Sequence, residues 1–187
     1  MTLDLGDFFL FQIEDPIMNL DAAPYGGARF PVTAMVDGRL FVRFSLDVAV
    51  GDPTIEPLDI LSGEDWLRFA GLPSKGIPAL SKEQQFAEKL HAYTLPRDGR
   101  TNSRVKDLID MILLIQTNSM EAVKVQAAIK ATWLRRRTHE LPEELAEPPE
   151  QWEGRFRQLA EECRLSMTLE DAYETVCGFY RSAFPRG

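Results

Sequence analysis

Residues 42–51 alternate apolar and polar side chains, which is the period of a β-strand with one covered face. Asp37-Gly38, just before this stretch, is a two-residue signal typical of a β-hairpin. Beyond that turn the even-numbered positions are apolar, so one face should pack while the other presents Arg43 and Asp47. Aromatic and β-branched residues mark three expected strands, at 7–13, 29–36 and 39–50.

A helical period replaces the alternation after a loop-rich connection, residues 51–80, that contains repeated proline and glycine. One helical turn is expected within it, near 64–70. Three cap signals mark helix starts: Ser81 with Gln84, Asn118 with Glu121, and Thr168 with Asp171. Together with the apolar periodicity they predict five helices, at 82–93, 104–116, 119–136, 150–163 and 169–183.

These elements predict an α+β protein in which a small antiparallel or mixed sheet precedes a helical bundle. We expect residues 1–80 to form the strand region and residues 81–187 the helical domain. The 187-residue chain is long enough to bury a substantial core. No apolar run reaches the roughly 18 residues that a membrane span requires, and the N-terminus has no signal-peptide pattern. We therefore expect a cytoplasmic protein that does not engage a membrane.

The helix expected at 104–116 is apolar nearly all the way round, yet it contains Asp107 and Asp110. Because they are three residues apart, the two carboxylates share one helix face. A buried carboxylate needs an ion pair, hydrogen bonds or a metal, since an isolated one is too costly to desolvate. Lys89, at the rim of the preceding helix's apolar face, is the nearest candidate partner. Removal of Asp107 is therefore expected to be the most destabilising charged-residue change in this segment.

Charge is unevenly distributed along a chain whose net charge is −8. Residues 66–139 hold 13 basic and 6 acidic side chains, whereas residues 1–65 hold 3 and 12, and residues 140–187 hold 5 and 11. The basic middle third contains Lys89 and both aspartates, which suggests an anionic ligand such as a nucleotide or RNA phosphate. The alternative is a solvated basic helix face that balances the acidic C-terminal third.

The cysteines and histidines add no catalytic pattern. Cys163 and Cys177 are too few for a disulfide framework, and no Cys/His cluster has zinc spacing. His91 and His139 have no serine, cysteine or glutamate spaced for a triad. We therefore expect all four side chains to be packing or surface residues.

Two motifs carry a family resemblance. Residues 87–92 (Ala-Glu-Lys-Leu-His-Ala) are followed by a Gly/Arg-rich turn and by residues 102–110 (Asn-Ser-Arg-Val-Lys-Asp-Leu-Ile-Asp). In order and spacing they resemble the third and fourth motifs of the AbiEii/AbiGii family, nucleotidyltransferase-fold toxins of bacterial toxin–antitoxin and phage-defence systems. Segments 26–30 and 44–48 resemble the strand region that bears a later carboxylate of that family.

The resemblance implies a nucleotidyltransferase that uses Mg²⁺ or Mn²⁺ with a nucleoside triphosphate. Its acceptor would be an RNA, such as a tRNA-like molecule, and its protein partner a cognate antitoxin. Lys89 would contact the triphosphate, and Asp107 and Asp110 would orient that lysine or the base. Arg104 and Lys106 would be further nucleotide-binding residues.

A purely structural role is the alternative for the same side chains. Asp107 and Asp110 would then form buried ion pairs with Arg104 or Lys106 that fix helix packing. Structural ion pairs and functional sites both shift the pKa values of their residues, so the sequence does not separate the two roles.

The acidic pair of the family is missing from its expected place. Family members carry Asp-x-Asp shortly after an N-terminal Gly-Ser or Gly-Gly turn, whereas Gly26-Gly27 leads into Arg29-Phe30. Asp47 is then the expected metal ligand, with a solvated strand residue paired with Arg43 as the structural alternative. One carboxylate does not suffice for two metals.

The first element of the nucleotidyltransferase sheet is therefore expected to be absent. Either the chain is truncated, or it is a pseudoenzyme that keeps the second half of the fold. Two function classes remain open. One is a toxin-like enzyme whose activity is impaired, and the other is a non-catalytic protein that engages an antitoxin or an RNA-binding partner.

Overall fold

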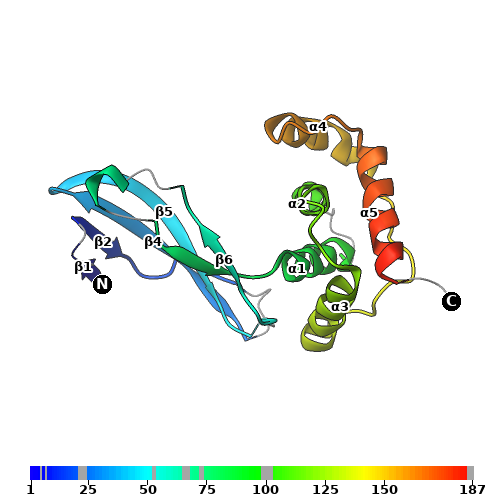
Figure 1. The fold of residues 1–187 in the computed structure, drawn as a ribbon, viewed down its shortest axis with the longest axis horizontal. Helices are drawn as coiled ribbons and strands as arrows, with labels where there is room; N and C mark the ends of the chain where they lie inside the picture. The colour runs from blue at the N-terminus through cyan, green and yellow to red at the C-terminus, as the bar shows by residue number, and fades with distance from the viewer. Residues whose placement is uncertain are drawn as a thin grey trace. The chain divides into compact units, whose positions relative to one another are not determined.

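The computed structural model describes residues 1–4, 6, 8–20, 25–51, 54–64, 68–71, 74–97 and 103–184. The chain forms two compact units, Met1–Asp52 and Pro53–Gly187, so residues 54–80 group with the helices. Figure 1 shows the elements of each unit. The expected α+β class is confirmed, because an antiparallel sheet in the N-terminal part is followed by helices.

The first unit is an antiparallel sheet built around one central strand. Its strands are β1 (Thr2–Asp4), β2 (Phe9–Ile13), β3 (Met18–Asn19), β4 (Gly27–Val36) and β5 (Arg39–Ala49). Strand β4 pairs with β5 along one side and with β2 and β3 along the other, and β1 pairs with β2. The three predicted strands are all present, with ends that differ by at most two residues.

The hairpin between β4 and β5 forms where the sequence predicts it. Val36 pairs with Arg39, which leaves Asp37 and Gly38 as the two loop residues. Their φ angles are 49° and 70°. Positive φ at both central positions matches the twist of the flanking strands and is favoured by Asp-Gly.

The prediction that one face of β5 packs is wrong. Phe44 and Leu46 are 44% and 47% exposed, and every residue of the strand is exposed. The described part of this unit contains no helix or second sheet to cover the strand. On β4, by contrast, Val32 and Ala34 are buried between β2 on one side and β5 on the other.

The second unit begins with a β-hairpin that was not predicted from the sequence. Strands β6 (Asp59–Ser62) and β7 (Gly76–Ala79) pair antiparallel inside the segment expected to be loop. A 3₁₀ turn, η1 (Arg68–Ala70), lies between them and corresponds to the predicted helical turn. Pro78 obscured the strand signal, because proline is tolerated only in edge strands or at bulges.

Five helices follow in the described part of the chain (Figure 1). They are α1 (Lys82–Thr94), α2 (Val105–Gln116), α3 (Ala122–Arg136), α4 (Glu153–Glu162, preceded by the 3₁₀ turn η2, Glu150–Trp152) and α5 (Leu169–Ala183). Helix α2 contacts α1, α4 and α5, and α1 also contacts α3. The core between them holds fully buried side chains such as Phe86, Leu108, Ile112, Ile129 and Phe156.

Two of the three predicted caps form. The Ser81 hydroxyl accepts a hydrogen bond from the amide of Gln84, and Thr168 with Asp171 makes a reciprocal capping box. The prediction for Asn118 is wrong. Its φ is 47° and its amide donates to Ile115 O, so Asn118 follows the end of α2 in a left-handed conformation. Helix α3 begins only at Ala122.

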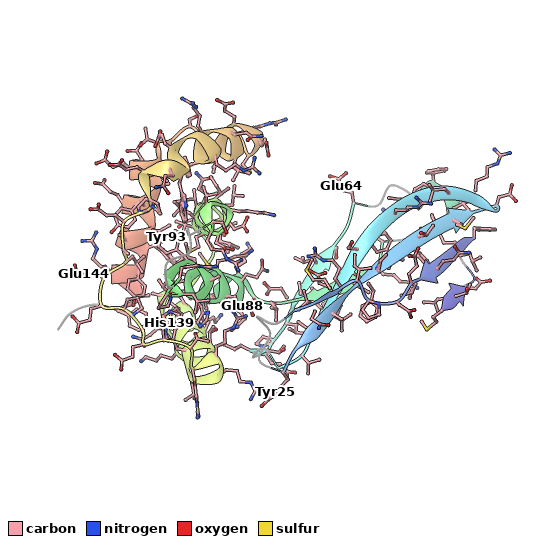
Figure 2. The ribbon with its side chains drawn as sticks, turned by 180° about the vertical axis from the view of Figure 1, so that it is seen from behind. Tyr25, Glu64, Glu88, Tyr93, His139 and Glu144 are labelled. Atoms are coloured by element: carbon pink, nitrogen blue, oxygen red, sulfur yellow. The ribbon has the colours of Figure 1, made fainter. Side chains whose placement is uncertain are left out.

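Three tyrosine hydroxyls fix the segment between α3 and α4. Tyr93 donates to Ala146 O at 2.8 Å, Tyr173 to Leu145 O at 2.6 Å and Tyr180 to Pro142 O at 2.5 Å. Figure 2 labels Tyr93 and, on this segment, Glu144. The hydroxyls therefore tie an irregular stretch to α1 and α5 through backbone acceptors that burial would otherwise leave unsatisfied.

Candidate functional site

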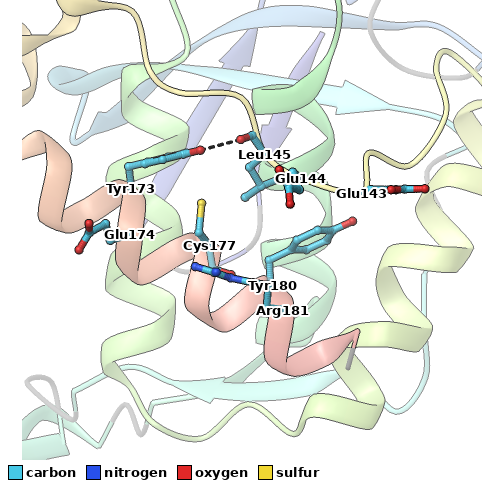
Figure 3. Close-up of a pocket in the computed structure, with 8 residues that line it drawn as sticks. All are labelled: Glu143, Glu144, Leu145, Tyr173, Glu174, Cys177, Tyr180 and Arg181. Carbon is cyan, nitrogen blue, oxygen red and sulfur yellow. Dashed lines mark hydrogen bonds between the residues drawn. The ribbon is translucent and has the colours of Figure 1, made fainter. Parts of the chain in front are cut away.

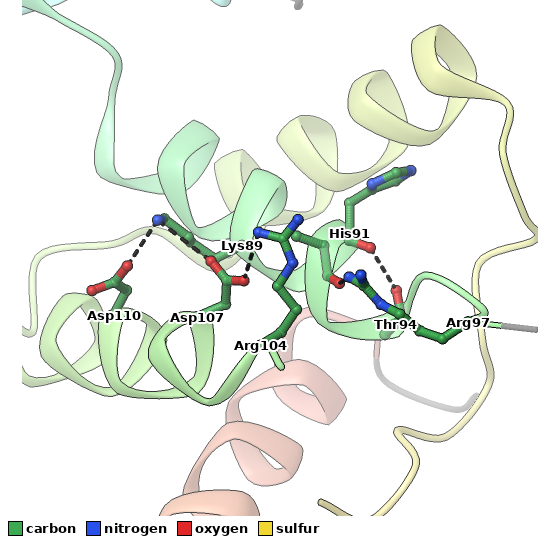
Figure 4. Close-up of polar contacts among 8 residues, drawn as sticks. Lys89, His91, Thr94, Arg97, Arg104, Asp107 and Asp110 are labelled. Carbon is green, nitrogen blue, oxygen red and sulfur yellow. Dashed lines mark hydrogen bonds and ion pairs between the residues drawn. The ribbon is translucent and has the colours of Figure 1, made fainter. Parts of the chain in front are cut away.

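The structure brings Lys89 together with both aspartates at the contact of α1 and α2 (Figure 4). The Nζ atom of Lys89 lies 2.7 Å from Asp110 Oδ2 and 3.5 Å from Asp107 Oδ1. The Asp107 side chain is 9% exposed and that of Asp110 is 24% exposed, whereas Lys89 is 37% exposed. The two carboxylates therefore contact the ammonium group while part of the Lys89 side chain remains exposed to solvent.

The local sequence explains this placement. Phe86 and Leu90 turn one face of α1 into the core, and Lys89, one residue before Leu90, comes to the rim of that face. On α2, Leu108 and Met111 are fully buried, and the two aspartates precede them on the flank that faces α1. The three charged groups meet because both helices bury the residues beside them.

Arg104 extends the cluster and Lys106 does not. The Nη1 atom of Arg104 lies 3.5 Å from Asp107 Oδ2, so Asp107 is held between two cations. Lys106 is exposed on α2 and has no ion pair among the residues that the structure describes. The two positive and two negative charges of Lys89, Arg104, Asp107 and Asp110 balance.

Opposing effects act on the charge of Lys89. Burial alone would lower its pKa, but the hydrogen bond to Asp110 and the negative charges of Asp110 and Asp107 outweigh burial and raise the pKa above its usual value. Lys89 therefore stays protonated throughout the neutral and moderately alkaline range. An ammonium group has three donors, and the two carboxylates leave one for a ligand.

Asp47 lies in the other unit, on the polar face of the sheet. Its carboxylate accepts two hydrogen bonds from Arg29 on β4, with Nε at 2.6 Å from Oδ1 and Nη2 at 2.8 Å from Oδ2. The hydrogen bonds from Arg29 lower the pKa of Asp47 against an opposing effect of desolvation. Its partner is the arginine directly opposite on the neighbouring strand, not Arg43.

The described residues do not fit a two-metal site. Among them, no group of three or more His, Cys, Asp or Glu side chains is arranged to hold a metal ion. Asp47 already gives both oxygens to a guanidinium, whereas Mg²⁺ requires carboxylate oxygens in near-octahedral geometry. Asp7 and Asp52, the other carboxylates that the sequence offers near these strands, lie outside the described residues.

A histidine network around the buried side chain of His91 was not predicted from the sequence. His91 Nε2 lies 2.8 Å from the Thr138 hydroxyl, which is 3.0 Å from His139 Nδ1, and His139 Nε2 is 2.9 Å from the Thr94 hydroxyl. Figure 2 labels His139. Burial, with the positive charge of Arg136, lowers the pKa of His91 to about 4. The ring is therefore neutral at pH 7 and packs against Trp133.

The helical periodicity of α1 places His91 among buried residues, and this pattern could have indicated the network from the sequence. His91 lies four residues after Ala87 and seven after Gln84, and all three are buried. A histidine on that stripe must find hydrogen-bond partners inside the protein. Its hydrogen-bond partner, Thr138, follows α3, so spacing along the sequence gives no sign of the contact.

A separate pocket of about 280 Å³ lies between α5 and the segment that precedes α4 (Figure 3). Glu143, Glu144, Tyr173 and Cys177 are among its lining residues. Burial raises the pKa of the Cys177 thiol, which makes it a poor nucleophile. None of the residues that the sequence predicts for the site lines this pocket.

The architecture and the comparisons agree on the class of protein. An antiparallel sheet followed by helices is consistent with a nucleotidyltransferase-like fold. Residues 4–176 match the model of the family described as the nucleotidyl transferase AbiEii toxin of type IV toxin–antitoxin systems. The chain belongs to this family. It is thus a toxin-type nucleotidyltransferase by family, as the motifs at 87–92 and 102–110 indicated.

None of the curated proteins compared with the chain matches it. The family generally uses a nucleoside triphosphate and a divalent metal, and its type suggests an antitoxin partner. Within the described residues, no helix is long and apolar enough to span a membrane.

Proposed function

We propose that this chain is the toxin-type component of a toxin–antitoxin pair and that Lys89 holds the phosphates of a nucleoside triphosphate. The observation that supports this most strongly is the geometry of the ammonium group. Two carboxylates fix its position at 2.7 and 3.5 Å, and 37% of the side chain remains exposed. A charged donor that is oriented in advance binds an anion at a lower entropic cost.

Asp107 and Asp110 act as positioning residues in this proposal. They orient Lys89 and keep it protonated, and they are not offered as direct ligands of the phosphates. Arg104, 41% exposed, and Lys106 stand on the same helix and add positive charge at the rim. This charge offsets the two carboxylates and favours the approach of a polyanion.

The nucleotide acceptor and the protein partner that we propose rest on the charge distribution of the chain and on its family. The basic residues of the segment 66–139 suit an RNA acceptor such as a tRNA-like molecule. The toxin–antitoxin family supports a cognate antitoxin, with phage defence in the cytoplasm as the setting we propose.

Transfer is proposed to be impaired in this chain. Asp47 would be the metal ligand for Mg²⁺ or Mn²⁺, yet Arg29 occupies both of its oxygens. One carboxylate engaged in this way does not hold two metals. This observation favours, as a second candidate, a protein that binds the nucleotide and its partners without catalysing transfer.

The test combines a binding assay and a transfer assay on the same preparations. We expect the parent chain to bind nucleoside triphosphate but to transfer little label from an α-labelled nucleotide to RNA with Mg²⁺ or Mn²⁺. Lys89→Ala should lose binding, and Lys82→Ala, a matched lysine of the same helix that bonds Ser119, should keep it. Absence of binding by the parent would overturn the proposal.

Robust transfer that Asp47→Asn abolishes would contradict the proposed impairment alone. It would make Asp47 a metal ligand and would mean that carboxylates outside the described residues, such as Asp7 or Asp52, complete the site. Transfer that is insensitive to Asp47→Asn would remove Asp47 from the site altogether.

A further inference from the structure

Strand β5 has an unusually open edge. Of the strands that the structure describes, it pairs only with β4. The amide of Val50 donates to Gly26 O, so the backbone of Val50 faces β4. Because antiparallel strands alternate the direction of their backbone groups, those of Arg43, Ser45 and Asp47 face away from β4. Their amides and carbonyls form a row that is ready to pair with another strand.

The central part of this edge strand lacks most of the usual protections. Natural edges carry proline, charged residues (especially lysine) or bulges that hinder pairing with other chains. The segment 39–49 contains no proline, glycine or lysine. Its only irregularity lies at the hairpin end, where the register shifts opposite Ala34 and Met35. The rest of the strand is regular over Val42–Ala49.

The apolar face of the same strand is also uncovered. Its even-numbered residues from Val42 to Val48 are 42–47% exposed. Side chains on adjacent strands of one face interact most strongly when they are directly opposite each other. A partner strand with the same alternation would therefore give these residues apolar neighbours.

We propose that this edge pairs with β5 of a second copy of the chain, antiparallel about a two-fold axis at Ser45. In this register Arg43 of each copy lies opposite Asp47 of the other, so two symmetric charge pairs form. Arg43 is exposed and has no ion-pair partner among the described residues. Asp47 is 44% exposed despite its bonds to Arg29, and a carboxylate accepts more than two hydrogen bonds.

The same register joins the apolar faces. Val42 of one copy lies opposite Val48 of the other, and Phe44 opposite Leu46. Because directly opposed residues of an antiparallel pair share one face, the two exposed apolar faces become a single continuous one. The backbone pairs at Ser45 and at Arg43 with Asp47 each exchange two hydrogen bonds.

Neighbouring registers fit less well. An axis at Phe44 places Arg43 opposite Ser45 and Asp47 opposite Phe41, which leaves no charge pair. An axis at Arg43 places Asp47 opposite Arg39, which lies beyond the irregularity at the hairpin end. It also places the two Arg43 side chains opposite each other in the regular part of the strand, and like charges directly opposite are destabilising. Charge complementarity therefore selects the axis at Ser45. This inference does not depend on the proposed nucleotide site.

The test is the oligomeric state of the full chain by sedimentation equilibrium at micromolar concentration. We expect a dimer for the parent. Arg43→Glu and Asp47→Arg should each raise the dimer dissociation constant about tenfold or more, because each variant paired with itself opposes two like-charged pairs. An equimolar mixture of the two variants should form a heterodimer near the parent's affinity, since every opposed pair in it has opposite charges.

A backbone variant gives an independent readout. Ser45→Pro removes an amide that faces the open edge and bonds no residue of β4, so the hairpin should fold while the dimer is lost. Ser45→Ala keeps the amide and should keep the dimer. A monomeric parent would overturn the proposal, as would a dimer that Ser45→Pro leaves intact. Failure of the mixed variants to associate would overturn it even if Ser45→Pro does not fold.

Discussion

The ion cluster between α1 and α2 predicts that Lys89→Ala is more destabilising than removal of either aspartate. When the ammonium group of Lys89 is removed, Arg104, at 3.5 Å, is the ion-pair partner that Asp107 keeps among the described residues. The Asp107 side chain is only 9% exposed. Asp110 loses a contact of 2.7 Å. Asp107→Ala, in contrast, leaves Lys89 paired with Asp110, so no buried charge is left without a partner.

The free-energy cost of Lys89→Ala should lie between those of two known kinds of ion pair. Breaking a fully buried ion pair costs about 3–5 kcal/mol, whereas an exposed pair contributes about 0–1 kcal/mol. Lys89 is 37% exposed and Asp110 24% exposed, so solvent screening reduces the upper value. We expect Lys89→Ala to cost about 2 kcal/mol, and Asp107→Ala about 1 kcal/mol.

Denaturant unfolding of a double-mutant cycle measures this difference. The double variant Lys89→Ala with Asp107→Ala should cost less than the sum of the single variants, with a coupling of about 1 kcal/mol at unchanged m-value. Lys82→Ala is the control, because it removes a lysine of α1 that bonds a serine hydroxyl at 2.8 Å. If Lys89→Ala were no more destabilising than Lys82→Ala, or if the coupling were zero, the two carboxylates would not be held as described.

Three further substitutions should alter stability in ways that the described contacts predict. His91, whose pKa is lowered to about 4 by burial, takes up a proton more readily in the unfolded chain. Stability should therefore fall as pH drops from about 6.5 towards 4, and His91→Phe should reduce this slope in unfolding measured across that range. Tyr93→Phe, which removes the bond to Ala146 O, should cost about 1 kcal/mol in denaturant unfolding. Thr168→Ala, which removes the cap of α5, should cost about 1 kcal/mol, and Thr168→Ser should restore most of it.

The helices and the main hairpin could be predicted because their signals are local. Asp37-Gly38 requires positive φ at both positions, and apolar periodicity places Phe86, Leu90 and Leu108 in the core. Asn118 shows the limit of such signals. An asparagine suits either the start of a helix or the left-handed residue that follows one, and only the packing of α2 decides between them.

The site was predictable where two helices adjacent in sequence form it. Lys89, Asp107 and Asp110 meet because α1 and α2 pack on consecutive apolar faces. Asp47 was assigned to the polar face correctly, but the identity of its partner depends on strand register, which places Arg29 opposite it. The exposed face of β5 and the threonine links between His91 and His139 depend on tertiary contacts that periodicity does not encode.

Calorimetric titration of a nucleoside triphosphate into the parent chain, Lys89→Ala and Lys82→Ala tests the central claim most directly. A charge-assisted contact contributes about 1.5–3 kcal/mol, so Lys89→Ala should weaken binding about tenfold or more. Lys82→Ala should bind as the parent does, and the circular dichroism spectrum of each variant should confirm that it is folded. Equal affinity of a folded Lys89→Ala variant and the parent would show that the lysine held by Asp107 and Asp110 is a structural ion pair and not a phosphate site.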